Sequence, residues 1–118
     1  MSIAKNTICW LILLALFVPS ASAMGEAKTL PVTIVHKQCS QLSRTAGLIM
    51  QARQLNISMS KSMETALMVE DETIRTIQME LVKEAYKKPV YPSEQSRQKA
   101  IRDFENKWYL TCTEVMGE

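Results

Sequence analysis

Residues 93–116, SEQSRQKAIRDFENKWYLTCTEVM, are the stretch that decides the fold. Apolar side chains recur in it at three- and four-residue steps, which is typical of a helix with one buried face. Ser93 is the expected N-cap, and Glu94 follows it in the first turn. The expected buried face consists of the Arg97 stem, Ala100, Ile101, Phe104, Trp108, Cys112 and Val115. The stretch therefore predicts a long amphipathic helix with a cysteine near its end.

The cysteine at the end of this helix has one expected partner. Of the three cysteines, Cys9 lies in an expected targeting segment, so Cys39 and Cys112 remain. An even number of cysteines in a small exported chain is typical of a disulfide. Because Cys39 begins one predicted helix and Cys112 ends another, a bond between them requires these helices to be antiparallel. It would close a loop of about 70 residues and stabilise the fold by about 4 kcal/mol.

The first 23 residues have the pattern of a cleaved signal peptide. Lys5 precedes an apolar run over residues 8–18, and residues 21–23 (Ala-Ser-Ala) match a cleavage site. The run is about half of the roughly 20 residues that a spanning helix needs, so we expect cleavage after Ala23 rather than a membrane anchor. The protein is then periplasmic or secreted. Without Lys5 the net charge falls from +2 to about +1, which gives no basic footprint for nucleic acid.

Three further helices are expected before residue 93. A helix over residues 37–55 has its buried face at Cys39, Leu42, Ala46, Ile49, Met50 and Arg53. Gly47 inside it is a candidate for a close helix contact, and Asn56 for a left-handed stop. A second helix, capped by Ser58 or Ser60, runs to about residue 69, and a third from about residue 70 to 87. One continuous helix over residues 60–86 is the alternative, since no Gly or Pro divides them.

The expected apolar positions of the two shorter helices are Met59, Met63, Ala66 and Leu67, then Ile74, Ile77, Leu81 and Ala85. Residues 24–36 show no helical period and are expected to form an extended arm, with a short strand over residues 29–35 as an option. The prediction is an all-α domain over residues 37–118, a small bundle of three to four helices stapled by one disulfide. A cleaved signal peptide and the arm precede it.

Several of these segments resemble a group of small exported bacterial and prophage-associated helical proteins with one cysteine pair. The matching segments are Cys39 with QARQ at 51–54, EAYKKPVY at 84–91, and AI at 100–101 with FENKWY at 104–109 and Cys112. The group has no assigned activity, so the resemblance implies only export and paired cysteines. In architecture alone, the chain is also similar to HdeA-type periplasmic chaperones and to immunity proteins against secreted amidases, and architecture does not determine function.

The residue types argue against an enzyme. His36 is the only histidine, and a thiol nucleophile needs a free cysteine beside such a base. One histidine and two separated cysteines do not supply a zinc site, and no cofactor motif is present. Thioethers bind copper(I), so Met59, Met63 and Met68 allow an alternative function as a copper(I) or small-ligand carrier.

The remaining candidates for function are surface side chains. Tyrosine, tryptophan and cations are common in protein interfaces, and methionine-rich helices adapt to apolar partners. The partner-binding candidates are Tyr86, Lys88, Tyr91, Tyr109, Met59 and Met63, with Trp108 interpreted as a core anchor. We therefore expect a small exported protein that binds another exported protein, as an inhibitor, an immunity factor or a chaperone-like holdase.

Overall fold

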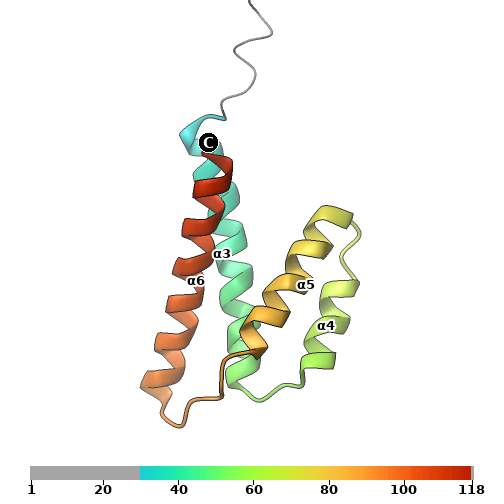
Figure 1. Cartoon of the computed structure of the whole chain (residues 1–118), viewed down its shortest axis with the longest axis vertical. Coiled ribbons are helices and arrows are strands. Elements are labelled where there is room, and N and C mark those ends of the chain that lie inside the picture. The colour runs from blue at the N-terminus through green and yellow to red at the C-terminus, as the bar shows by residue number, and fades with distance from the viewer. Residues whose placement is uncertain (1–29, 118) are drawn as a thin grey trace, which may run out of the picture. The chain divides into compact units, whose positions relative to one another are not determined.

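The computed structural model describes residues 30–117, which form four α-helices (Figure 1). They are α3 (Val32–Gln54), α4 (Met59–Leu67), α5 (Glu72–Tyr86) and α6 (Glu94–Met116). This part of the chain contains no β-strand, which confirms the all-α class. All four helices belong to the unit that begins at Val32, and none of them is long and apolar enough to cross a membrane.

The long helices α3 and α6 lie side by side and antiparallel, and they share the most extensive helix contact (Figure 1). The shorter helices α4 and α5 form a hairpin that packs on α3 mainly through α5. Cys39 near the start of α3 is bonded to Cys112 near the end of α6, with their Cα atoms 5.5 Å apart. The predicted cysteine pairing and the antiparallel arrangement that it requires are therefore confirmed.

The predicted extended arm is wrong for residues 32–36, because α3 begins at Val32. Val35 is 7% exposed and lies four residues before Cys39, so it continues the buried face of the helix. Burying a valine stabilises by about 1.5 kcal/mol or more, which outweighs the few tenths that β-branched residues cost in a helix. The strand option over residues 29–35 fails for the same reason. The signal segment and residues 24–29 lie outside the described residues.

The helix breaks follow local capping chemistry. Asn56 has a φ of 61°, the left-handed conformation expected for the stop of the first helix. Ser58 caps α4 by accepting a hydrogen bond from the Lys61 backbone N–H at 3.2 Å. Ser93 caps α6 in the same way, through the Ser96 N–H at 3.0 Å. These caps set the boundaries that the sequence indicated for both helices.

A turn over residues 68–71 divides the segment 60–86 into two helices, so the continuous-helix alternative is wrong. Asp71 accepts a hydrogen bond from the Ile74 N–H at 2.9 Å and caps α5. Arg75 donates to the backbone carbonyls of Val69 and Glu70, at 2.9 and 3.3 Å, and holds the turn closed. No glycine or proline is needed here because side chains satisfy the backbone groups that the turn frees.

The core lies where α3, α5 and α6 meet. Its buried members are Ala46, Met50, Leu81, Ala85 and Phe104. Half-buried Trp108 packs against this cluster and meets Phe104 edge to face at 6.2 Å, as expected for a core anchor. Gly47 lies against Glu105 of α6, where a β-carbon would lie 2.7 Å from the Glu105 Cγ atom. The close helix contact predicted at this glycine is confirmed.

Four residues at predicted apolar positions are in fact exposed: Met59 by 41%, Leu67 by 54%, Ile74 by 49% and Val115 by 72%. The buried residues of α5 all lie in its C-terminal half, so the far end of the hairpin, with Leu67 and Ile74, has no third helix to cover it. At the end of α6, Met116 rather than Val115 turns toward the disulfide. Helical periodicity gives the correct face but not the length over which a neighbouring helix covers it.

Candidate functional site

The loop over residues 87–93, which joins α5 to α6, is fixed by a buried glutamine. Gln54, at the end of α3, is only 5% exposed. Its amide nitrogen donates to the Pro89 carbonyl and its oxygen accepts from the Tyr91 N–H, both at 2.9 Å. Since a buried amide is costly unless it is hydrogen-bonded, Gln54 strongly favours this one loop conformation.

Two arginine side chains also donate hydrogen bonds to backbone carbonyls of this loop. Arg53 donates to the Lys88 carbonyl at 2.8 Å, and Arg97 donates to the carbonyls of Tyr91 and Pro92 at 3.1 Å. The backbone on both sides of the Lys88 and Tyr91 side chains is therefore tied to α3 and α6. Prolines 89 and 92 restrict it further.

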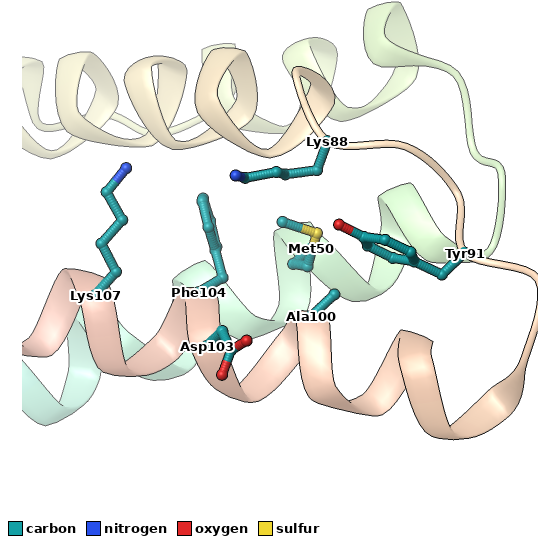
Figure 2. A pocket seen from close by; sticks show the side chains of 7 residues that line it. All are labelled: Met50, Lys88, Tyr91, Ala100, Asp103, Phe104 and Lys107. Carbon is teal, nitrogen blue, oxygen red and sulfur yellow. The ribbon is translucent and has the colours of Figure 1, made fainter.

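This loop and α6 enclose a cleft of about 180 Å³, which we call the basic cleft (Figure 2). Its lining residues are Met50, Lys88, Tyr91, Ala100, Asp103, Phe104 and Lys107. Met50 and Phe104 form an apolar floor, since they are 1% and 4% exposed. Figure 2 shows the Lys88 and Lys107 side chains on the two sides of the Phe104 ring, and the Tyr91 hydroxyl turned toward Met50.

The charges around the basic cleft are not balanced. Glu84 accepts hydrogen bonds from Lys87 at 2.9 Å and from Lys107 at 3.4 Å, and these two ammonium groups hold the pKa of Glu84 below its usual range. Asp103 pairs with Lys99 at 2.6 Å. Within residues 30–117, no carboxylate lies within ion-pair distance of the Lys88 ammonium. The cleft therefore presents an unneutralised cation above an apolar floor.

The structure places two of the six predicted partner-binding residues, Lys88 and Tyr91, in the basic cleft. Tyr86 lies instead at the base of the hairpin, where its hydroxyl donates to the Ile57 carbonyl at 2.7 Å and lies 2.8 Å from the Ser62 hydroxyl. Its ring also faces the Arg53 guanidinium at 5.2 Å. These contacts give Tyr86 a structural role.

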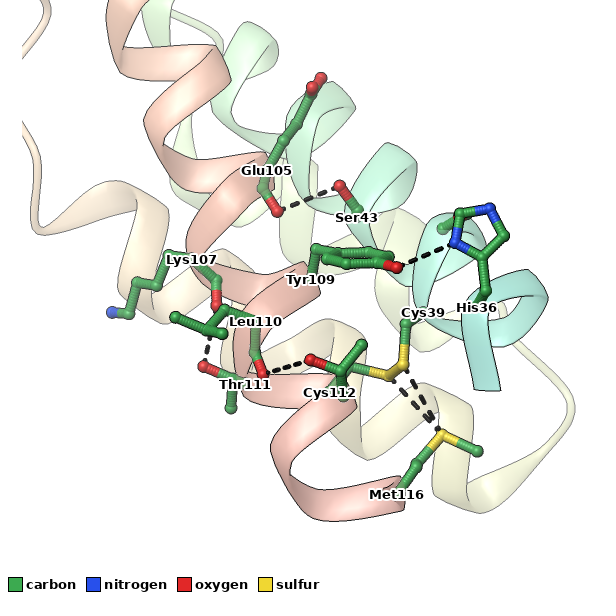
Figure 3. The surroundings of a disulfide bond; sticks show 12 residues. His36, Cys39, Ser43, Glu105, Lys107, Tyr109, Leu110, Thr111, Cys112 and Met116 are labelled. Carbon is green, nitrogen blue, oxygen red and sulfur yellow. Dashed lines mark hydrogen bonds between the residues drawn. A yellow bond between two sulfur atoms is a disulfide. The ribbon is translucent and has the colours of Figure 1, made fainter. Parts of the chain in front are cut away.

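Tyr109 lies at the opposite end of the helix pair, beside the disulfide (Figure 3). Its hydroxyl is 2.8 Å from His36 Nδ1. The Met116 sulfur lies 3.6 Å from Cys112 Sγ and 3.9 Å from Cys39 Sγ, contacts of van der Waals type because disulfide sulfurs carry no proton. With Cys39 bonded to Cys112, neither thiol is free to act as a nucleophile beside His36.

The methionine candidates are on α4, away from the basic cleft. Met59 is 41% exposed and Met63 is half-buried, while Met68 is 81% exposed and lies past the end of the helix. Residues 30–117 contain no group of three or more His, Cys, Asp or Glu side chains able to hold a metal ion. Copper(I) carriage by these methionines stays a prediction.

A second hollow, of about 220 Å³, lies between α3, α4 and α5. It has no charged lining residue: its walls are Thr45, Leu48, Ile49, Ala52, Ser62, Thr65, Ala66, Gln78 and Val82. It therefore differs in chemistry from the basic cleft, which has ammonium groups and a phenol at its edge.

No residue pattern places Lys107 and Phe104 in one site with Lys88. Phe104 and Met50 are predicted only on buried helix faces. The sequence feature that could have indicated the contact with this loop is the pair Arg53-Gln54. These two polar residues end a buried helical face, and they lie 35 residues before the carbonyls that they bind. Comparison with family models, curated proteins and solved structures found no match.

Proposed function

We propose that this protein is exported and acts by binding another exported protein, and that the basic cleft is the contact site. The observation that carries the proposal is the Lys88 ammonium, unpaired within residues 30–117, above the apolar floor of Met50 and Phe104. Binding sites combine an apolar surface with a few placed polar groups that set orientation and specificity. The basic cleft has this composition.

The rigidity of the loop supports selective binding. Gln54, Arg53 and Arg97 hold the loop before any partner arrives, so binding orders few additional groups. A chaperone-like holdase instead benefits from a broad and adaptable apolar surface. The preformed cleft therefore favours an inhibitor or immunity factor over a holdase.

The test is capture of a partner from an extract of exported proteins by the purified protein and two variants. Lys88→Glu reverses the charge in the basic cleft. Lys61→Glu makes the same charge change on α4, where the side chain is 72% exposed and outside the cleft. We expect a protein that is retained by the wild type and by Lys61→Glu but not by Lys88→Glu. Retention that is equal for all three, or no enriched protein, would contradict the proposal.

A further inference from the structure

We infer that the basic cleft selects a segment of the partner in which an aliphatic side chain has a glutamate or aspartate beside it. This inference rests on the proposed function and adds the chemistry that the partner must present. Three features of the cleft carry it: the charge of Lys88, the hydroxyl of Tyr91 and the size of the apolar floor.

The positive charge of the basic cleft indicates an anionic ligand. Each acidic side chain near the cleft already has a lysine partner, with Glu84 bound by Lys87 and Lys107, and Asp103 by Lys99. Of the two lysines that line the cleft, Lys107 pairs with Glu84, whereas Lys88 has no carboxylate partner within residues 30–117. Figure 2 shows the Lys88 side chain directed toward Phe104. One unpaired ammonium matches a singly charged carboxylate better than a phosphate, which carries more charge and usually binds several donors.

Tyr91 supplies a second donor. Its backbone is fixed at both sides, through the Gln54 oxygen at 2.9 Å and the Arg97 guanidinium at 3.1 Å. Within residues 30–117 its hydroxyl makes no hydrogen bond, and in Figure 2 it is directed into the cleft. An ammonium and a phenol that approach from the same loop can each donate to one oxygen of a carboxylate.

The volume of the cleft limits the size of the rest of the ligand. The cleft encloses about 180 Å³, whereas sites for cofactors and drug-sized molecules measure roughly 300–1,000 Å³. The space suits one aliphatic side chain on Met50, Ala100 and Phe104. Met50 is unbranched, so it can adjust to the shape of that side chain. A feature as small as one side chain on a protein surface therefore fits the cleft.

A second copy of this chain is the competing occupant. The turn of the α4–α5 hairpin presents Met68, 81% exposed, two residues before Glu70. This turn has the chemistry inferred for the ligand. Self-association must therefore be measured before any ligand is added.

The probes are three end-blocked pentapeptides with the central sequences Glu-Leu-Glu, Gln-Leu-Gln and Glu-Ser-Glu between serines. They are titrated into the full chain labelled at methionine and alanine methyl groups, and NMR shifts are followed at Met50 and Ala100. We expect the Glu-Leu-Glu peptide to shift both methyls, and the two other peptides to bind about tenfold more weakly. Lys88→Gln should reduce affinity for Glu-Leu-Glu by about tenfold and Tyr91→Phe by about threefold, while Lys61→Gln leaves it unchanged.

Three results would overturn this inference. The first is equal binding of the glutamate and glutamine peptides, and the second is no shift at Met50 up to millimolar peptide. The third is self-association that sedimentation detects in the wild type and not in Lys88→Glu, since the occupant is then a second copy. If the peptides fail while partner capture still depends on Lys88, the proposed function stands and only the assigned ligand chemistry is wrong.

Discussion

Replacing Gly47 by alanine measures how closely α6 approaches α3. Alanine in a helix interior is more favourable than glycine by about 1 kcal/mol, so an uncontacted position would be stabilised by that amount. Here the new β-carbon would lie 2.7 Å from Glu105 Cγ, and nearer still to the carboxylate. Overpacking costs about 1–3 kcal/mol, and the lower end applies because Glu105 is half-buried and can rotate away. The two effects should cancel, or leave Gly47→Ala destabilised by up to about 1 kcal/mol.

A double-mutant cycle with Glu105→Ala separates the two effects. Without the Glu105 side chain, Gly47→Ala should stabilise the protein by about 1 kcal/mol, which gives a coupling energy of about 1–2 kcal/mol between the two sites. Urea unfolding followed by circular dichroism measures all four proteins. Gly47→Leu is the control, since its larger side chain should destabilise in both backgrounds. Equal stabilisation by Gly47→Ala with and without Glu105 would refute the close approach of the helices.

Three other changes test separate parts of the structure. Cys112→Ala should destabilise by about 4 kcal/mol, the chain-entropy value for a closed loop with a sequence separation of 73, and unchanged thermal stability would contradict it. Tyr86→Phe should cost about 1 kcal/mol in urea unfolding, because the Ile57 carbonyl loses its donor. Glu84→Gln should make the free energy of unfolding fall less steeply in acid. A carboxylate with a lowered pKa stabilises the fold at neutral pH, and this contribution is lost as the pH falls through its folded-state pKa. Identical pH profiles of unfolding for wild type and Glu84→Gln would exclude that role.

The all-α class, the cysteine pairing and most helix boundaries were predictable because they depend on local signals. A serine side chain can cap a helix that begins directly after it, so Ser58 and Ser93 indicate helix starts from the sequence alone. The α6 boundary agrees with the prediction to one residue. Cys39 and Cys112 were the only pair left after the signal segment was set aside. The start of α3 was mispredicted because Val32 to Val35 are poor helix formers by local preference, and burial of Val35 against the rest of the fold outweighs that preference.

The basic cleft was not predictable because its parts come from three distant segments. Met50 belongs to α3, Lys88 and Tyr91 to the loop, and Phe104 and Lys107 to α6. A residue pattern can place each on a helix face or in a loop, but the register between α3 and α6 decides which faces meet. Near the cleft, the contact at Gly47 and the hydrogen bonds of Gln54 to the loop before α6 hold the two helices in this register.

A disulfide holds α3 and α6 together at one end of the pair, and hydrogen bonds hold them at the other. The disulfide joins the start of α3 to the end of α6, and Gln54 at the end of α3 binds the loop that leads into α6. Since Met50 lies one helical turn from Gln54, the basic cleft depends on the hydrogen bonds of Gln54 and not on the disulfide.

Replacing both cysteines by serine should therefore lower the unfolding temperature, yet leave the NMR shift of the Met50 methyl group unchanged below that temperature. The Met116 methyl shift should move in the same variant, because Met116 contacts both sulfurs. A change at Met50 as large as that at Met116 would show that the disulfide also determines the geometry of the cleft.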